Sequence, residues 1–279
     1  MKTTITKTII ASVMALFTFN AFAQKNFYLK LNGAYNLGTT ATLNGLSNQT
    51  QSGTVTTNEI VELAFGKGIN FGGAVGYMFN KNIGTELNIS YLLGGTTTAK
   101  NSSNSSTSSN SINLDYSSTM LSFIPSIVIT PGFEKINPYA RFGLIIGVPT
   151  VTGKLSNSNT FNGETNTTNQ TTIFNGSLAF GSQSAFGIDY KINDKFSLFG
   201  ELNFTSLTYT PTKGEITESK LNGVDNLATL NTRDKKIEYV DIISQDINVA
   251  PDPNAPQKAI KPSLPFSSVG INVGVVYHF

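Results

Sequence analysis

Eight segments of alternating apolar and polar residues run through this chain, and the connections between them alternate between long and short. The short connections are residues 80–82, 133–137 and 193–195, and the long ones are 39–67, 96–118, 151–176 and 210–265. A two-residue period is typical of β-strands with one apolar and one polar face. Because a transmembrane barrel places short turns at one end and long loops at the other, the pattern predicts that architecture.

Alternation alone leaves open which face of the barrel is inside. A soluble, lipocalin-like barrel would bury the apolar face, whereas a membrane barrel turns it toward lipid. The polar faces carry Gly, Asn and Ser rather than many Lys and Glu, which favours a small polar interior. Aromatic residues also gather near the short turns and predict an interfacial girdle; they are Phe27, Tyr77, Phe79, Tyr190, Phe196, Tyr277 and Phe279.

The eight predicted strands begin near Asn26 and end at Phe279. The fourth, about 119–130, is apolar on both faces and carries Pro125. Proline lacks the N–H that a β-ladder needs, so we expect a bulge or a local break there.

Residues 1–23 have the features of a secretory signal peptide: Lys2 and Lys7, then an apolar run, then Ala21-Phe22-Ala23. The apolar run is shorter than the ~20 residues of a transmembrane helix. Cleavage would leave 24–279 as the barrel. The chain has 19 Lys+Arg and 17 Asp+Glu, and the leader removes two Lys, so the mature chain is neutral and offers no support for a nucleic-acid partner.

Six titratable residues lie on the polar faces of the strands and form a predicted charge network in the lumen: Lys30, Glu86, Arg141, Asp189, Glu201 and His278. Eight strands enclose a lumen that side chains can fill. Unpaired buried charges are costly, so we expect Arg141 or Lys30 to pair with Glu86 and Glu201. The lumen is then either filled by side chains or a gated pathway for ions.

The chain resembles the small eight-stranded outer-membrane barrels of the OmpA transmembrane domain and the OmpX/opacity-protein group, over 26–279 and by topology. Its most specific element is the end, where Val275, Tyr277 and Phe279 resemble the signal read by the barrel-assembly machinery. The resemblance implies a bacterial outer-membrane location, outer-membrane lipids as surroundings, periplasmic chaperones and the assembly machinery as biogenesis partners, and a structural or adhesive role. We expect a monomer.

The long connections differ in composition. Residues 96–118 and 156–172 are Ser/Thr/Asn tracts, which predict a mobile hydrophilic brush. Residues 210–265 have mixed charge, and we expect 237–249 to form a short strand or helix over the barrel mouth. An extracellular ligand, if there is one, would bind this loop.

An enzyme is the rival class, because some small outer-membrane barrels modify lipid A. Acyl transfer uses a general base, most often His, and the one histidine, His278, is predicted at the short-turn end. The spacing of Asp225, Asp241 and Asp246 is not diagnostic. With no Cys and one His, oxygen-bound calcium is the conceivable metal. The sequence therefore predicts no catalytic, cofactor or metal site, and a narrow pore remains the second alternative.

Overall fold

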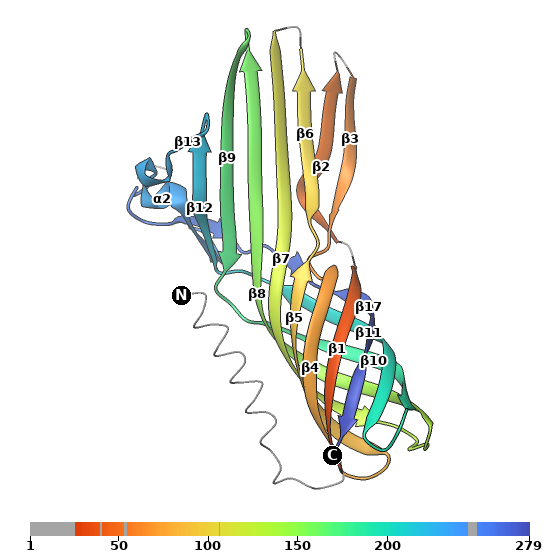
Figure 1. The fold of residues 1–279 in the computed structure, drawn as a ribbon. Helices are drawn as coiled ribbons and strands as arrows, with labels where there is room; N and C mark the ends of the chain where they lie inside the picture. The colour runs from red at the N-terminus through yellow and green to blue at the C-terminus, as the bar shows by residue number, and fades with distance from the viewer. Residues whose placement is uncertain (1–25, 40, 53–54, 106, 245–249) are drawn as a thin grey trace.

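The computed structural model describes residues 26–39, 41–52, 55–105, 107–244 and 250–279. Eight strands close into an antiparallel ring (Figure 1). In ring order they are β1 (Phe27–Gly38), β4 (Gly68–Met78), β5 (Ile83–Gly94), β7 (Ser108–Ile129), β8 (Ile136–Phe161), β10 (Ala179–Lys191), β11 (Phe196–Tyr209) and β17 (Ser268–His278). The ring closes where β1 pairs with β17, from Tyr28 opposite His278 to Gly38 opposite Ser268. The predicted eight-stranded barrel is confirmed.

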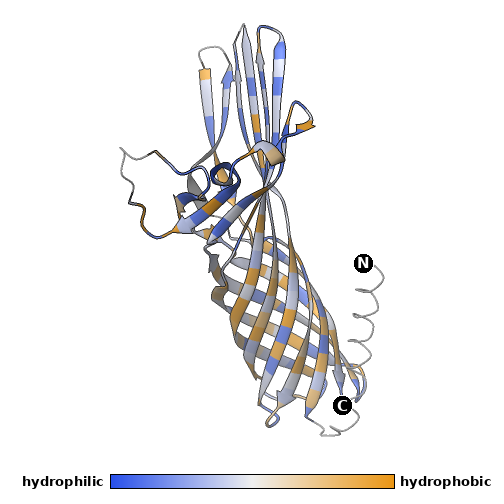
Figure 2. Ribbon diagram, turned by 90° about the vertical axis from the view of Figure 1, so that its left-hand side faces the viewer, coloured by the Kyte–Doolittle hydropathy of each residue, from blue (hydrophilic) through white to orange (hydrophobic). Residues whose placement is uncertain are grey.

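The apolar faces of these strands point outward, as the alternation predicted. Leu31 and Leu144 are 73% and 67% exposed, whereas their neighbours Lys30 and Ile145 are buried. Figure 2 shows hydrophobic and hydrophilic residues alternating along the barrel strands. Within the described residues no helix is long and apolar enough to cross a membrane.

The short turns are shaped by asparagine side chains. Asn80 Oδ1 accepts hydrogen bonds from the backbone N–H groups of Asn82 and Ile83, at 2.8 and 2.9 Å. Asn193 Oδ1 does the same for Lys195 and Phe196, at 2.9 Å each. Such bonds replace ladder partners in a tight turn, so these connections can stay short.

Pro125 causes a local break without a bulge. Pairing between β7 and β8 runs to Phe123 opposite Ile146 and resumes at Ser126 opposite Gly143, in the same register. The ladder between β7 and β5 continues through Pro125, which lies opposite Leu87. The missing proline N–H therefore affects only the β8 side.

Strands from the four long connections form an outer sheet above the barrel (Figure 1). It continues β7 and β8 upward, and its strand order is β3-β2-β6-β7-β8-β9-β12-β14-β15. The added elements are β2 (Ala41–Ser52), β3 (Val55–Leu63), β6 (Thr97–Asn104), β9 (Glu164–Asn175), β12 (Lys213–Leu221), β13 (Val224–Asp225), β14 (Lys236–Val240) and β15 (Gln257–Ile260). A 3-10 turn (Leu227–Thr229), the four-residue helix α2 (Thr232–Lys235) and β16 (Leu264–Pro265) complete the chain.

The prediction of a mobile brush is wrong for 96–118 and 156–172. These residues lie mostly in β6, β7, β8 and β9. A Ser/Thr/Asn tract buries too little apolar surface to fold alone. Here β7 and β8, which are 22 and 26 residues long in all, extend beyond the barrel. Their outer edges supply hydrogen-bond partners to the tracts beside them.

The prediction for 237–249 is right about a strand and wrong about its place. Residues 236–240 form β14, which pairs with β12 and β15 at the margin of the outer sheet rather than over the mouth. The part at 245–249 lies outside the described residues. β14 lies beside β12 because the Tyr239 N–H bonds the Thr212 carbonyl just after β11 ends, at 2.9 Å.

Candidate functional site

Four of the six predicted lumen charges meet inside the barrel. Lys30 Nζ lies 2.8 Å from Glu86 Oε2, and Arg141 NH2 lies 2.7 Å from Glu201 Oε1. Arg141 Nε is 3.6 Å from Glu86 Oε1 and joins the two pairs. The side chains come from β1, β5, β8 and β11, and none is more than 8% exposed. We call Lys30, Glu86, Arg141 and Glu201 the charge cluster.

Neutral side chains complete the charge cluster. The Tyr28 hydroxyl donates to Glu86 at 3.0 Å and the Tyr139 hydroxyl donates to Glu201 at 2.9 Å. The Lys30 ammonium also lies over the rings of Tyr139 and Phe199, 4.8 and 4.9 Å from their centroids. A buried ion pair is stable only when its remaining donors and acceptors are satisfied. The cluster has two cations and two anions, so it is neutral.

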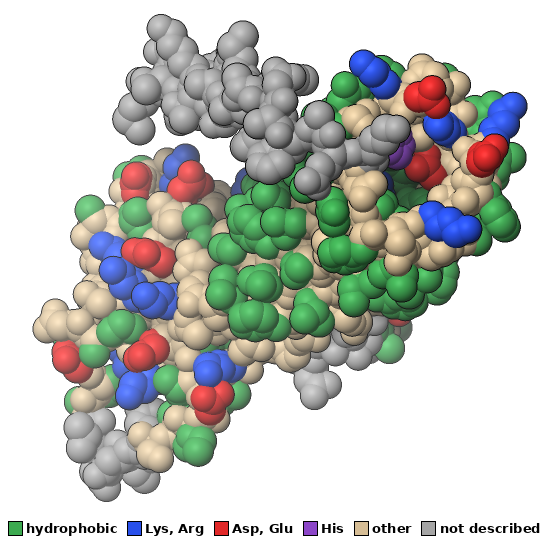
Figure 3. All heavy atoms as spheres, turned by 90° about the horizontal axis from the view of Figure 1, so that it is seen from below, with side chains coloured by type: hydrophobic (Ala, Val, Ile, Leu, Met, Phe, Trp, Pro, Cys, Tyr) green, Lys and Arg blue, Asp and Glu red, His purple; other side chains and the backbone are tan. Residues whose placement is uncertain are grey.

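The other two predicted residues, Asp189 and His278, lie nearer the short-turn end. His278 Nε2 is 3.0 Å from Ser197 Oγ. Asp189 and His278 line a cavity of about 360 Å³ that also touches Lys30 and Tyr139. Figure 3 shows this end from below, with the histidine beside acidic side chains in a hollow. Water at the short-turn end therefore reaches the underside of the charge cluster.

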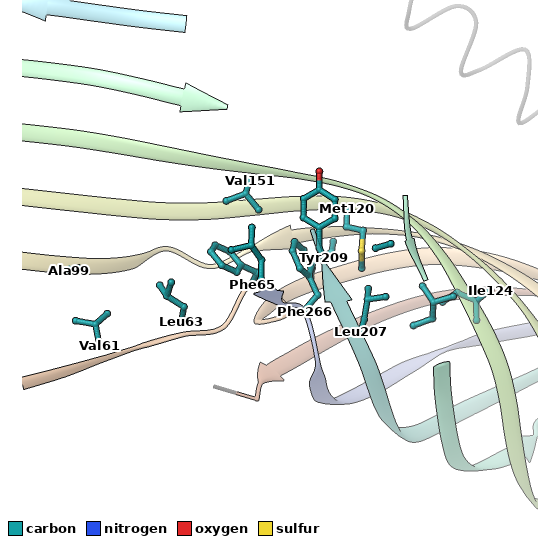
Figure 4. Close-up of a cluster of buried hydrophobic side chains, with 14 residues drawn as sticks. Val61, Leu63, Phe65, Ala99, Met120, Ile124, Val151, Leu207, Tyr209 and Phe266 are labelled. Atoms are coloured by element: carbon teal, nitrogen blue, oxygen red, sulfur yellow. The ribbon is translucent and has the colours of Figure 1, made fainter. Parts of the chain in front are cut away.

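The opposite end of the lumen is closed by apolar side chains. Phe65 and Phe266 stack with ring centroids 5.7 Å apart, and Tyr209 meets Phe266 edge-on at 5.9 Å. Leu63 and Leu207 pack with them, and each of the five is at most 4% exposed (Figure 4). We call Leu63, Phe65, Leu207, Tyr209 and Phe266 the apolar closure.

Two connections carry Leu63, Phe65 and Phe266 of the apolar closure, and they are bonded to each other and to β11, which carries Leu207 and Tyr209. The Phe65 N–H donates to the Pro265 carbonyl at 2.9 Å, and the Phe266 N–H donates to the Leu207 carbonyl at 2.9 Å. Gly66 lets the two backbones approach, because a Cβ there would lie 2.2 Å from the Phe266 oxygen. The closure is thus part of the folded backbone.

The sequence did not reveal the apolar closure. Phe65 belongs to the long connection 39–67 and Phe266 comes directly after the connection 210–265, so neither drew attention as part of an alternating segment. The sequence did carry a signal for them: each is an isolated aromatic residue two or three positions before the first residue of a strand, which is Gly68 for β4 and Ser268 for β17. Only the pairing of residues 65 and 265 shows that they meet.

The outer sheet has a free edge at β3. Among the described residues, β3 has one hydrogen-bonded neighbour, β2. Its residues 55–60 are exposed, and they include Val55 and Ile60 at 64% and 71%. An exposed edge strand offers unpaired N–H and C=O groups to another strand.

The acidic residues of the last long connection have other partners. Asp241 bonds the Lys261 ammonium at 2.9 Å, and Asp225 accepts from the Leu227 N–H at 2.9 Å. Asp246 lies outside the described residues. No group of three or more potential metal ligands occurs in the described part of the chain.

The predicted assembly signal lies on the outer face of β17 and just past it. Val275 and Phe279 are 42% and 44% exposed, and Tyr277 meets Phe196 and Phe279 at ring-centroid distances of 5.3 and 5.2 Å. Its role in assembly stays a prediction.

Comparisons with known proteins agree with this architecture. A family model described as outer membrane protein beta-barrel domain matches residues 9–229. A search of curated proteins found no match.

Three similar solved structures share little sequence with this chain. Ail, the attachment invasion locus protein of Yersinia pestis, is 11% identical (TM-score 0.32; 92% of this chain and 100% of Ail covered). CarO of Acinetobacter baumannii is 14% identical, with a TM-score of 0.28, and the match covers 90% of this chain and 98% of CarO. The outer membrane protease OmpT of Escherichia coli is 9% identical, with a TM-score of 0.30, and the match covers 92% of this chain and 98% of OmpT. The fold assignment rests on the strand pairing and the family match rather than on these likenesses.

Proposed function

The chain belongs to the outer membrane protein beta-barrel domain family, and from that premise we propose that it is a closed barrel that presents its outer sheet for recognition at the cell surface. Its place is the bacterial outer membrane, with the short turns in the periplasm and the outer sheet outside. The observation that carries the proposal is the outer sheet with its free β3 edge.

The free edge supports recognition of an extended segment of a partner. A peptide or edge strand can add to β3 through backbone hydrogen bonds, and its side chains would then lie beside those of residues 55–60. Neither Pro nor Lys, two residues that commonly protect sheet edges, occurs in β3; Glu59 and Glu62 are its charged residues.

The lumen supports a closed barrel over the alternative of a narrow pore. An ion crossing it would meet the apolar closure at the extracellular end and the charge cluster below it. Side chains from four strands around the wall meet in the charge cluster, and β11 and two connections supply the apolar closure, as suits the narrow lumen of an eight-stranded barrel.

The third alternative, a lipid-modifying enzyme, has little support from the placement of its base. His278 lies beside Ser197 at the periplasmic end, and Ser197 is 1% exposed. A nucleophile must touch its substrate, and outer-leaflet lipid lies at the other end of the barrel. We therefore propose a non-enzymatic role.

The test uses the β3 edge directly. Successive N–H groups of an edge strand point alternately to its neighbour and to solvent. Of Thr57→Pro and Asn58→Pro, one removes a ladder bond to β2 and the other removes only a free-edge donor. Amide hydrogen exchange in β2 distinguishes the two variants: β2 loses protection in the variant without the ladder bond and stays protected in the free-edge variant.

Each variant is expressed in a non-adherent bacterial strain. The cells are then applied to an array of immobilised extracellular proteins and glycans. We expect wild-type cells to be retained on at least one surface, and the free-edge proline to lower that retention at least tenfold while β2 stays protected. Equal retention of wild-type and empty cells on every surface would contradict a recognition role.

A further inference from the structure

β14 and β15 form a short arm that runs back toward the membrane. β12 rises from the barrel rim, since Lys213 lies opposite Asn175 and Leu221 lies opposite Thr168 of the descending strand β9. β14 is antiparallel to β12, and β15 is parallel to β14, so both descend. We call β14, β15 and the residues that follow them, 241–244 and 261, the arm.

Large apolar residues are exposed at the lower end of the arm. Ile242 and Ile243 follow β14 and are 80% and 37% exposed, and Ile260 ends β15 at 57%. The ion pair between Asp241 and Lys261, at 2.9 Å, joins the two descending ends. A cluster of exposed isoleucines at the tip of a polar sheet marks a contact surface.

The strand register places Ile260 in the same row of the sheet as an outward residue of the barrel. One row of paired residues runs from Val151 through Phe174 and Gly214 to Ile237 and Gln257. Ile260 lies three residues below this row on β15. Val148, an outward residue that is 47% exposed, lies three below it on β8.

Outward apolar residues reach this height on the neighbouring barrel wall as well. Phe180 lies opposite Ile146 and is 67% exposed on the outer face of β10, and Leu178 just before it is 52% exposed. The exposed isoleucines therefore continue a surface that already faces lipid.

We propose that the arm rests on the outer leaflet and inserts the side chains of Ile242 and Ile260 among the lipids. The partner is the acyl region of the leaflet, because the inserted groups are aliphatic and the charges beside them, Asp241 and Lys261, neutralise each other. The arm then fixes the tilt of the outer sheet relative to the membrane, independently of what the sheet recognises.

The chain contains no tryptophan, so a single introduced indole reports on one place. The test variants are Ile242→Trp and, as a second position should the first fold poorly, Ile260→Trp. The matched control is Phe161→Trp at the tip of β8, where the residue replaced is 62% exposed and far above the membrane. Folding of each is checked by heat-dependent migration in gels.

Each variant is reconstituted in phosphatidylcholine vesicles with and without bromine on the acyl chains. We expect brominated lipid to lower the emission at position 242 at least twofold and to leave position 161 unchanged, while iodide quenches position 161 more strongly. Equal iodide quenching at both positions, without an effect of brominated lipid at 242 or 260, would overturn the proposal.

Discussion

Glu201 shows at the residue scale how a charge is kept inside a narrow barrel. Its Oε1 accepts from Arg141 at 2.7 Å and from the Asn272 amide at 2.8 Å, and its Oε2 accepts from the Tyr139 hydroxyl at 2.9 Å. The partners come from β8 and β17, on either side of β11 around the wall. The carboxylate therefore holds three barrel strands together through one side chain.

Glu201→Gln tests this role. The amide keeps the shape but removes the charge opposite Arg141, and breaking a buried pair in this way costs about 3–5 kcal/mol. We expect the free energy of unfolding, measured by urea titration in detergent micelles, to fall by that amount.

The control for Glu201→Gln is Asp194→Asn in a periplasmic turn. Asp194 pairs with Lys191 at 2.9 Å, and its side chain is 99% exposed. The hydrogen bond and charge of Lys191 lower the pKa of Asp194. An exposed pair contributes little, and equal losses from the two variants would contradict a structural role for the charge cluster.

At the scale of single elements, the connection between β3 and β4 closes the barrel through a close backbone contact. Gly66 lies against the Phe266 carbonyl, and the Ser118 hydroxyl donates to the Phe65 carbonyl at 2.7 Å. Backbone and side-chain contacts thus hold this segment in place, although it belongs to a loop by sequence.

Gly66→Ala should separate the two connections that carry the apolar closure. The added Cβ meets backbone atoms, which cannot rotate away, so we expect a loss of about 1–3 kcal/mol in the free energy of unfolding. Gly33→Ala is the matched control, because nothing lies within 4 Å of a Cβ at that outward position. A loss from Gly33→Ala as large as that from Gly66→Ala would show that the contact at Gly66 is unimportant.

The barrel strands were predictable from sequence because burial alternates with the pleat. The segment between the connections 193–195 and 210–265, for example, coincides with β11. The extensions of β7 and β8 were not, because Ser, Thr and Asn dominate 108–118 and 150–161 and the alternation of Ile112, Leu114 and Tyr116 is short. Their strand form depends on ladders between distant segments, such as Ser111 opposite Ser158. Of the lumen residues, polarity identified the charges and left Tyr28 and Tyr139 unassigned.

At the scale of the whole molecule, the barrel and the outer sheet share β7 and β8 as continuous strands. Along β8, Arg141 lies in the charge cluster, Val151 packs beside the apolar closure, and Phe161 ends the outer sheet. A force on the outer sheet is thus carried directly into the barrel wall. This continuity suits a rigid display of β3 above the membrane.

The two layers that fill the lumen act in series, which leads to a prediction about conductance. The apolar closure offers a single hydroxyl, that of Tyr209, which is too little to replace the water around an ion, and the charge cluster fills the lumen below it. Wild-type protein in planar bilayers should therefore show no steady single-channel current. Phe65→Ala with Phe266→Ala should stay silent because the charge cluster remains, and Arg141→Ala should stay silent because the apolar closure remains.

Only the combined triple variant should conduct, provided that it keeps the heat-dependent gel migration of a folded barrel. Removing one layer leaves the other in place, so the current depends on both changes together rather than on their sum. The wild type alone is decisive even if the triple variant does not fold. A steady wild-type conductance that disappears in Arg141→Ala or Glu86→Ala would show that the charge cluster lines an ion pathway, and the closed-barrel proposal would then be wrong.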